Sequence, residues 1–183
     1  MIYPVTVFGD PVLRKIAAPI TADFQDLKGF IQNMFETMYN SDGVGLAAPQ
    51  VGHSIRVFIL DTTSDEDEEE PGIKRAFINP EIIEKYGEEW SMNEGCLSVP
   101  EIREDVFRPE SVKIKYQDEK FDVHEESFNG FTARVIQHEY DHLEGIMFVD
   151  YLNPLKKRIL KSKLTAISKG KVIPKYKIKI PGK

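Results

Sequence analysis

The feature that most constrains this chain is the stretch QHEYDHLEG, residues 137–145, where two histidines stand four apart and a glutamate follows the first. Side chains four residues apart on an α-helix lie on one face, one turn above the other. An apolar stripe leads into the motif and continues through both histidines: Phe131, Val135, His138 and His142. Both imidazoles should therefore face the interior, and Glu139 should lie about 100° further around the helix.

The HExxH pattern is typical of zinc peptidases, in which a third protein ligand completes the metal site. In one branch that ligand is a histidine in HExxHxxGxxH, but Phe148 occupies its position here. Another branch uses a glutamate further along the chain, and no Asp or Glu follows Asp150. The candidates that remain are Cys96, His53 and His124.

Cys96 lies in NEGCLSVP, residues 93–100, a segment in which a glycine directly precedes the cysteine and a proline stands at the end. A thiolate and two imidazoles would give three ligands and leave a fourth position for water. A lone cysteine is more often a small buried hydrophobe, so this assignment depends on the two inward histidines. His53 falls in a probable turn and His124 among charged strand residues, where a surface role is the usual one.

The segment GVGLAAPQVG, residues 43–52, superficially matches the dinucleotide fingerprint G-x-G-x-x-A. That fingerprint needs a strand before it and a helix after it. Here a helical pattern precedes it, and Pro49 breaks any helix that follows, so the context argues against nucleotide binding. A chain with so few side chains can run close beside a ligand, and Gln50 can donate an amide hydrogen bond inward.

The length of 183 residues, with 41% hydrophobic and 30% charged residues, predicts one globular domain over 1–183. No apolar run approaches the ~20 residues that span a bilayer, and the first residues do not resemble a signal peptide, so we expect a cytoplasmic protein. Cys96 is the only cysteine, which excludes an internal disulfide.

Helical periodicity predicts a helix over 24–38 capped by Thr21 or Asp23, a helix after Asn129-Gly130, and a helix over 155–168 begun by Pro154. Alternating patterns and turn residues predict a strand over 54–61, strand–turn–strand over 77–90, and a hairpin over 111–128 that turns at 118–120. An edge strand is expected over 171–180. The expected fold class is α+β. Mostly antiparallel strands pack around a central helix that carries HExxH, and a further helix follows near the C-terminus.

Charge is distributed unevenly along the chain. Residues 1–150 hold 30 acidic and 13 basic residues, a net charge of −17, whereas residues 151–183 hold 11 basic and no acidic residues. This basic C-terminal element is either a solvated helix face or a docking surface for an anionic partner such as nucleic acid. An acidic segment at about 62–72 reads as an exposed loop without chemistry.

Three segments, 43–52, 94–100 and 137–145, closely resemble in this order the three signature motifs of bacterial peptide deformylases. The resemblance extends to DPVLRKIAAP at 10–19 and FVDYLNPLKK at 148–157, and so covers most of the chain. Members of that family are hydrolases of protein biosynthesis. They carry out N-terminal processing by removing the formyl group from the formylmethionine of new polypeptides.

The resemblance implies one divalent metal ion, Fe²⁺ in the cell with Zn²⁺, Ni²⁺ or Co²⁺ as alternatives, held by Cys96, His138 and His142. It implies that metal-bound water attacks the formyl carbon, that Glu139 acts as general base and then acid, and that Gln50 and the backbone N–H of Leu97 stabilise the oxyanion. The substrate-binding positions that it implies are Val44, Gly45, Met92, Glu94, Arg103, Phe131 and Val135.

The implied partners are N-formylmethionyl nascent peptides, and the basic C-terminal element is a candidate for ribosome docking; neither a membrane nor DNA is expected. Two features depart from many relatives: the longer acidic loop, and a strand-like end after the last helix. The alternatives are a zinc endopeptidase and a ribosome-associated binding module with a structural metal.

Overall fold

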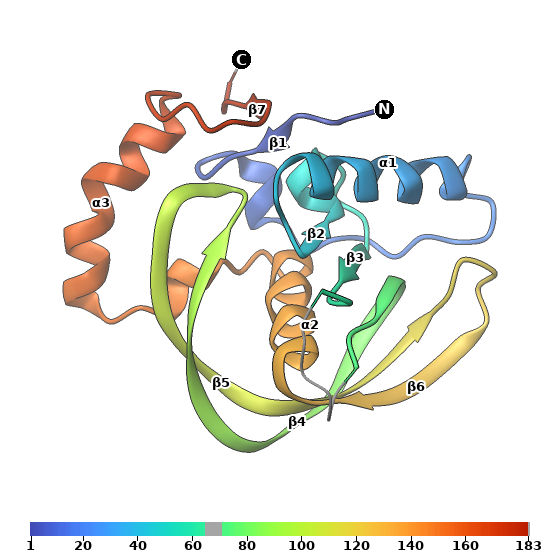
Figure 1. The fold of residues 1–183 in the computed structure, drawn as a ribbon. Helices are drawn as coiled ribbons and strands as arrows, with labels where there is room; N and C mark the ends of the chain where they lie inside the picture. Colours follow the sequence, from blue (N-terminus) through green and yellow to red (C-terminus); the bar gives the residue numbers. More distant parts are fainter. Residues whose placement is uncertain (65–70, 183) are drawn as a thin grey trace.

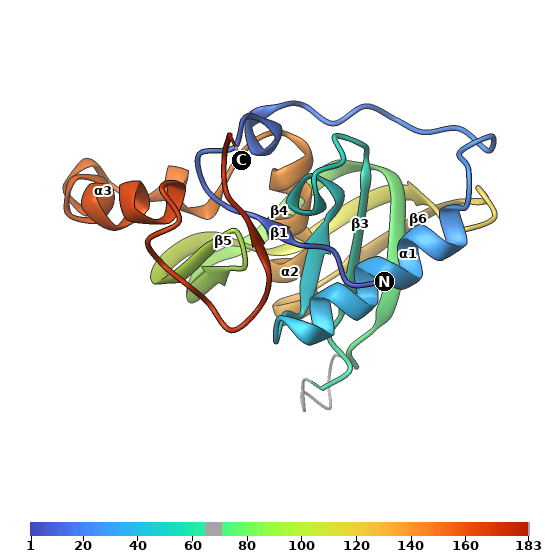
Figure 2. The ribbon, with the colours of Figure 1, turned by 90° about the horizontal axis from the view of Figure 1, so that it is seen from above.

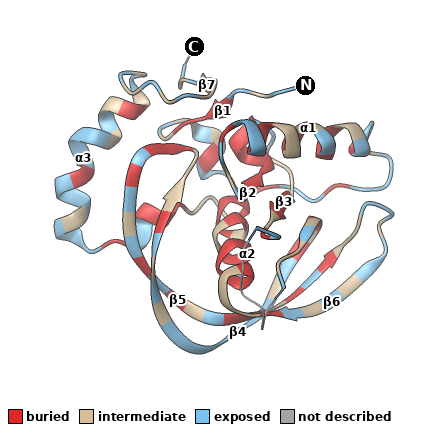
Figure 3. Ribbon diagram, in the orientation of Figure 1, coloured by how far each residue is buried: buried red, intermediate tan, exposed pale blue. Residues whose placement is uncertain are grey.

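The computed structural model describes residues 1–64 and 71–182, and its centre is the helix α2 (Gly130–Leu143). The predicted acidic loop lies largely outside the described residues. Helix α2 is buried on most sides, and the long β4–β5 ribbon bends around it (Figures 1 and 3). The prediction of a central helix that carries the histidine pair, in an α+β fold, is confirmed.

Within residues 1–64 and 71–182, the main sheet has five strands, each antiparallel to its neighbours. In spatial order they are β2 (Gly45–Ala47), β3 (Val57–Asp61), β4 (Lys74–Cys96), β5 (Val99–Gln117) and β6 (Val123–Phe128). Among the described residues, three short 3₁₀ helices lie between the larger elements: η1 (Pro11–Arg14), η2 (Ala48–Val51) and η3 (Phe148–Tyr151). No helix in the described part of the chain is long and apolar enough to cross a membrane.

The prediction of strand, turn and strand over 77–90 was wrong, because β4 continues through this region. Its register against β5 shifts between Ile78 and Glu81 and again between Tyr86 and Glu89. Asn79, at φ 49°, and Gly87, at φ 83°, have turn-like backbones at these two places. They form bulges that bend the strand without reversing it, and the bend lets the ribbon curve around α2.

Helix α1 (Leu27–Asn40) begins later than predicted, and its cap is neither Thr21 nor Asp23. Those two side chains bond to each other instead. Asp26 takes a left-handed backbone, and its carboxylate accepts a hydrogen bond from the Gly29 N–H at 3.2 Å. The apolar face of α1 then packs over β2 and β3.

The hairpin predicted over 111–128 is formed by β5 and β6, although β5 starts as early as Val99. Its turn is held by the Asp118 carboxylate, which accepts from the Lys120 N–H at 2.8 Å and the Asp122 N–H at 3.1 Å.

The last helix, α3 (Pro154–Ser168), agrees with its prediction, and the Asn153 side chain caps it. The edge strand expected over 171–180 is reduced to β7 (Ile178–Lys179), which pairs in parallel with β1 (Val5–Thr6). This two-stranded sheet is separate from the main sheet. Figure 2 shows the end of the chain running beside β1.

Candidate active site

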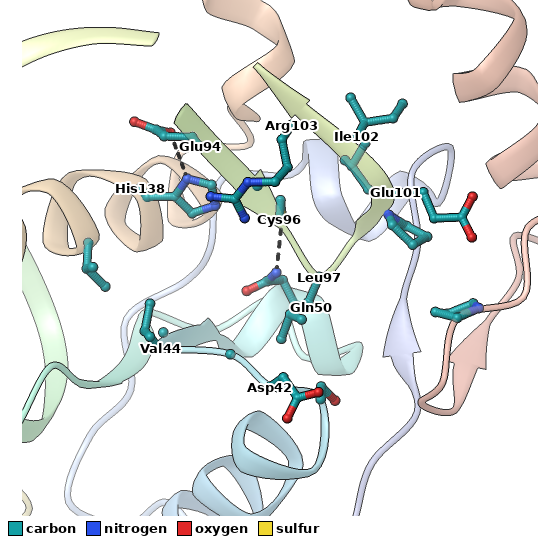
Figure 4. A pocket seen from close by; sticks show the side chains of 18 of the residues that line it. Asp42, Val44, Gln50, Glu94, Cys96, Leu97, Glu101, Ile102, Arg103 and His138 are labelled. Carbon is teal, nitrogen blue, oxygen red and sulfur yellow. Dashed lines mark hydrogen bonds and ion pairs between the residues drawn. The ribbon is translucent and has the colours of Figure 1, made fainter. Parts of the chain in front are cut away.

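A cavity of about 820 Å³ lies between the segment that leads into β2, the tight turn joining β4 to β5, and helix α2 (Figure 4). Residues 173–176 of the C-terminal part form a further wall. Three distant motifs of the sequence, the glycine-rich segment, the cysteine segment and the histidine helix, thus meet around one space.

Cys96, at the end of β4, lies against the two histidines of α2. The candidate ligand atoms of Cys96, His138 and His142 are all within 4.8 Å of one another, and the Cys96 sulfur is 3.3 Å from Nε2 of His142. One thiolate and two imidazoles are donors that suit zinc, iron, nickel or cobalt, so the residues fit a divalent metal ion.

The two other histidines lie outside this group. The ring of His53 packs against the rings of Tyr3 and Phe30. The Nε2 atom of His124 is 3.0 Å from the Asp118 carboxylate, in the β5–β6 hairpin. Of the three candidates that sequence left open, Cys96 is therefore the one that the fold brings to the histidine pair.

Behind His138 lies a buried network of charged side chains. The Glu94 carboxylate contacts Nδ1 of His138 at 3.0 Å, accepts from Arg108 at 2.7 and 3.1 Å, and accepts from Arg134 at 3.0 Å. Arg108 also donates to Asp141 at 2.6 Å. Burial by itself would raise the pKa of Glu94, but the hydrogen bonds from His138 and Arg108 outweigh it and hold that pKa well below its usual range.

This network orients the imidazole of His138. A carboxylate at Nδ1 fixes the ring and leaves Nε2 for the side on which Cys96 and His142 lie. Glu94 borders the cavity, as expected for a substrate position, but its carboxylate is engaged with His138, as Figure 4 shows, and with Arg108 and Arg134.

Glu139 is buried, and its Oε2 atom has no hydrogen-bond partner among the described residues. Burial raises the pKa of Glu139 to about 7. A Cβ atom built on Gly45 would lie 2.5 Å from Oε1 of this carboxylate, a distance at which something must move. Gly45 therefore provides the space in which the Glu139 side chain sits.

Gln50 is held so that its amide nitrogen faces the turn between β4 and β5. Its Oε1 accepts from the Ala47 N–H at 2.8 Å, while Nε2 donates to the Cys96 sulfur at 3.5 Å and to Oγ of Ser98 at 3.3 Å. Because the oxygen is occupied by the backbone, the NH₂ group is the end of the amide that points toward the cavity (Figure 4).

All of the positions expected to bind substrate border the cavity: Val44, Gly45, Met92, Glu94, Arg103, Phe131 and Val135. Arg103 is directed along the rim by two hydrogen bonds to Asn93, at 2.9 and 2.6 Å. Glu139, Gln50, Leu97, Cys96 and His138 border it too, and His142 lies deeper, 1% exposed.

Sequence reasoning missed the residues that support the site from behind. Arg134 and Asp141 stand four before and three after His138 on the same helix, so helical spacing would have brought them into view. Arg108 and Tyr176 have no such signal, because each meets the site only through long-range folding.

Comparison with known proteins supplies independent information. The family model described as "Polypeptide deformylase" matches residues 2–158. A peptide deformylase of Christiangramia forsetii is 52% identical over 99% of this chain and 97% of its own length, and one of Flavobacterium johnsoniae is 52% identical over 98% and 96%.

Solved structures agree with these matches. The crystal structure of a peptide deformylase from Legionella pneumophila aligns with a TM-score of 0.82 at 38% identity, over 93% of this chain and 98% of that one. A structure of the Acinetobacter baumannii enzyme, described as bound to Met-Ala-Ser, aligns with a TM-score of 0.77 at 40% identity, over 83% and 99%.

Proposed function

This chain belongs to the polypeptide deformylase family, and from that premise we propose how its cleft removes the formyl group from the N-terminal formylmethionine of nascent polypeptides. Water adds to the formyl carbon, the C–N bond breaks, and formate and a free amino terminus leave. The observation that carries the proposal is the meeting of a sulfur and two imidazoles beside a buried carboxylate that has one oxygen without a partner among the described residues.

Cys96, His138 and His142 would hold one divalent ion, for which we propose Fe²⁺ in the cell, with Zn²⁺, Ni²⁺ or Co²⁺ able to replace it. When bound, such an ion lowers the pKa of water from about 16 to about 7 and polarises a carbonyl group. Glu94 supports this role of His138 by fixing its ring.

Glu139 takes the proton from the attacking water and delivers it to the nitrogen of the leaving amine. Its support is geometric: the carboxylate borders the cavity next to the ligand group, and its Oε2 is not used by any other described residue. General acid–base catalysis of this kind contributes about 10²–10⁴ in rate.

Two donors stabilise the oxyanion that forms on the formyl oxygen: the side-chain amide of Gln50 and the backbone N–H of Leu97. Gln50 is fixed with its NH₂ group inward. A preorganised donor of this type contributes about 10²–10³ in rate, because it needs no rearrangement as the charge develops.

The apolar lining provides for the methionine side chain. Val44, Met92, Phe131 and Val135, together with the ring of His138, surround a space for an unbranched apolar group, and Arg103 at the rim would hold the peptide backbone. The Met-Ala-Ser tripeptide named for the Acinetobacter baumannii structure is a deformylated product of this kind and supports the assignment.

The test is formate release from formyl-Met-Ala-Ser by protein prepared anaerobically with iron. We expect Glu139→Gln to keep its metal and to lose about 10²–10⁴ in kcat, whereas Cys96→Ser should bind the ion poorly. Failure of the loaded wild-type protein to release formate, or cleavage of internal peptide bonds, would contradict the proposal.

The basic C-terminal element, residues 151–183, supports a second part of the proposal, docking on the ribosome in the cytoplasm. Helix α3 lies at the edge of the molecule and is exposed along most of its length (Figures 1 and 3).

The docking proposal is tested by co-sedimentation with ribosomes. Arg158→Glu and Lys161→Glu should weaken the binding, and raising salt from about 50 to about 200 mM should weaken the binding of the wild-type protein. Salt-independent binding would argue against an RNA contact.

A further inference from the structure

The C-terminal segment, residues 171–182, forms a wall of the cleft that lies beyond the residues matched by the family model, which end at 158. It leaves α3, passes the cavity, where residues 173–176 line it, and ends beside β1 (Figure 2). The segment therefore runs from the end of α3, past the proposed reaction centre, to β1.

This segment is anchored immediately after it passes the cavity. The Val5 N–H donates to the Lys177 carbonyl at 2.8 Å, and the Val7 N–H donates to the Lys179 carbonyl at 3.2 Å. Ile178 also packs against a buried apolar cluster. Tyr176 thus stands directly before backbone that is held by pairing with β1.

The Tyr176 hydroxyl donates a hydrogen bond of 2.8 Å to the carbonyl of Leu97, 79 residues away in the sequence. Leu97 and Ser98 form the turn between β4 and β5, since Cys96 pairs with Val99. Burial, together with the charge of Cys96, raises the pKa of the Tyr176 phenol, so the phenol stays protonated and remains a donor.

Other parts of the chain hold the second residue of the same turn. The Phe8 N–H donates to the Ser98 carbonyl at 2.8 Å, and Gln50 donates to the Ser98 hydroxyl at 3.3 Å. The carbonyl of Leu97 is held by Tyr176. The turn that carries the proposed oxyanion donor is therefore held by three separate segments of the chain, through Phe8, Gln50 and Tyr176.

We propose that Tyr176 is a positioning residue for deformylation, acting through the orientation of Leu97. This inference rests on the proposed role of the Leu97 N–H as an oxyanion donor. The N–H and C=O of Leu97 lie in two peptide planes that meet at its Cα. The Cys96–Val99 pairing holds the chain before Leu97, so fixing the Leu97 carbonyl limits the rotations that would turn its amide. Hydrogen bonds weaken steeply with misalignment, and small displacements of catalytic groups cost large factors in rate.

The decisive variant is Tyr176→Phe, which removes only the hydroxyl. The matched control is Tyr86→Phe, because Tyr86 lies on β4, is 37% exposed and is not among the residues that line the cavity. Formate release from formyl-Met-Ala-Ser is measured on iron-loaded protein, normalised to metal content, at a temperature where circular dichroism shows both variants folded. We expect Tyr176→Phe to lower kcat about tenfold with KM within about twofold of wild type, since the loosened donor acts on the oxyanion and not on the bound substrate.

A wild-type kcat in Tyr176→Phe, or a raised KM with unchanged kcat, would overturn the positioning role while leaving the deformylase proposal intact. Wild-type protein that releases no formate would instead remove the proposed function itself. If Tyr176→Phe lowers the melting temperature strongly, kcat and KM are measured again well below that melting temperature: a persistent loss of kcat with unchanged KM supports the role, and recovery of the wild-type kcat counts against it.

Discussion

At the scale of single residues, the site depends on a buried carboxylate that is shared between an imidazole and two guanidinium groups. Glu94, Arg108 and Arg134 each have side chains no more than 4% exposed. Removing one partner from such a group leaves the others charged and shielded from water. The resulting loss in folding free energy is far larger than the net stabilisation that the intact pair provides.

We therefore expect Glu94→Gln to reduce the free energy of unfolding by about 3–5 kcal/mol, measured by urea denaturation. Glutamine keeps the size of the side chain but leaves Arg134 without its anionic partner and Arg108 with Asp141 alone. The matched control is Glu125→Gln, whose partner is Lys113 in a pair where both side chains are at least 40% exposed. The idea is wrong if both variants have the same stability.

Gly45 gives a second prediction at this scale. Gly45→Ala places a methyl group 2.5 Å from the Glu139 carboxylate, so that side chain must move away from the cavity. We expect kcat to fall by about 10²-fold, while metal content measured by atomic absorption stays at the wild-type level, because the ligands come from other elements. Loss of metal together with activity would mean that the substitution disturbs the whole site.

At the scale of elements, local signals decide which helices sequence can locate. Helices α2 and α3 start at an Asn-Gly pair and an Asn-Pro pair, and both starts agree with prediction, as does the end of α3. Helix α1 is capped by Asp26, whose left-handed backbone (φ 52°) no pattern indicates. The bulges of β4 were read as a turn, because asparagine and glycine favour both.

The cap of α1 can be tested directly. Asp26→Ala removes the hydrogen bond to the Gly29 N–H and puts alanine in a left-handed conformation, so we expect a loss of about 1–2 kcal/mol in the free energy of unfolding. Asp23→Ala, at one of the two caps that the sequence suggested, should change stability much less. Thermal unfolding followed by circular dichroism compares the two, and equal effects would reject Asp26 as the cap.

At the scale of the whole molecule, the site exists only where segments far apart in sequence converge. The candidate ligands and their order along the chain were accessible from sequence, because each motif is local. The contacts of Arg108 with Asp141 and of Tyr176 with Leu97 were not, because they join residues 33 and 79 positions apart and follow from the curvature of the ribbon and the course of the chain end.

A metal held by Cys96 and two residues of α2 would join the β4–β5 turn to the central helix and stabilise the folded state by mass action. Removing iron with a chelator under anaerobic conditions should therefore lower the melting temperature of the wild type. Cys96→Ser should show a much smaller difference between treated and untreated samples. An equal chelator effect in both would mean that the ion does not bind through the thiolate.

The parallel pairing of Val5–Thr6 with Ile178–Lys179 has a consequence for the order of folding. Val5 and Ile178 lie 173 positions apart, so their pairing closes a loop that contains the main sheet and helices α1, α2 and α3, and this closure is entropically costly until the loop is compact. The small sheet, and the cleft wall that it anchors, should therefore form late, after the main sheet and α2 have assembled.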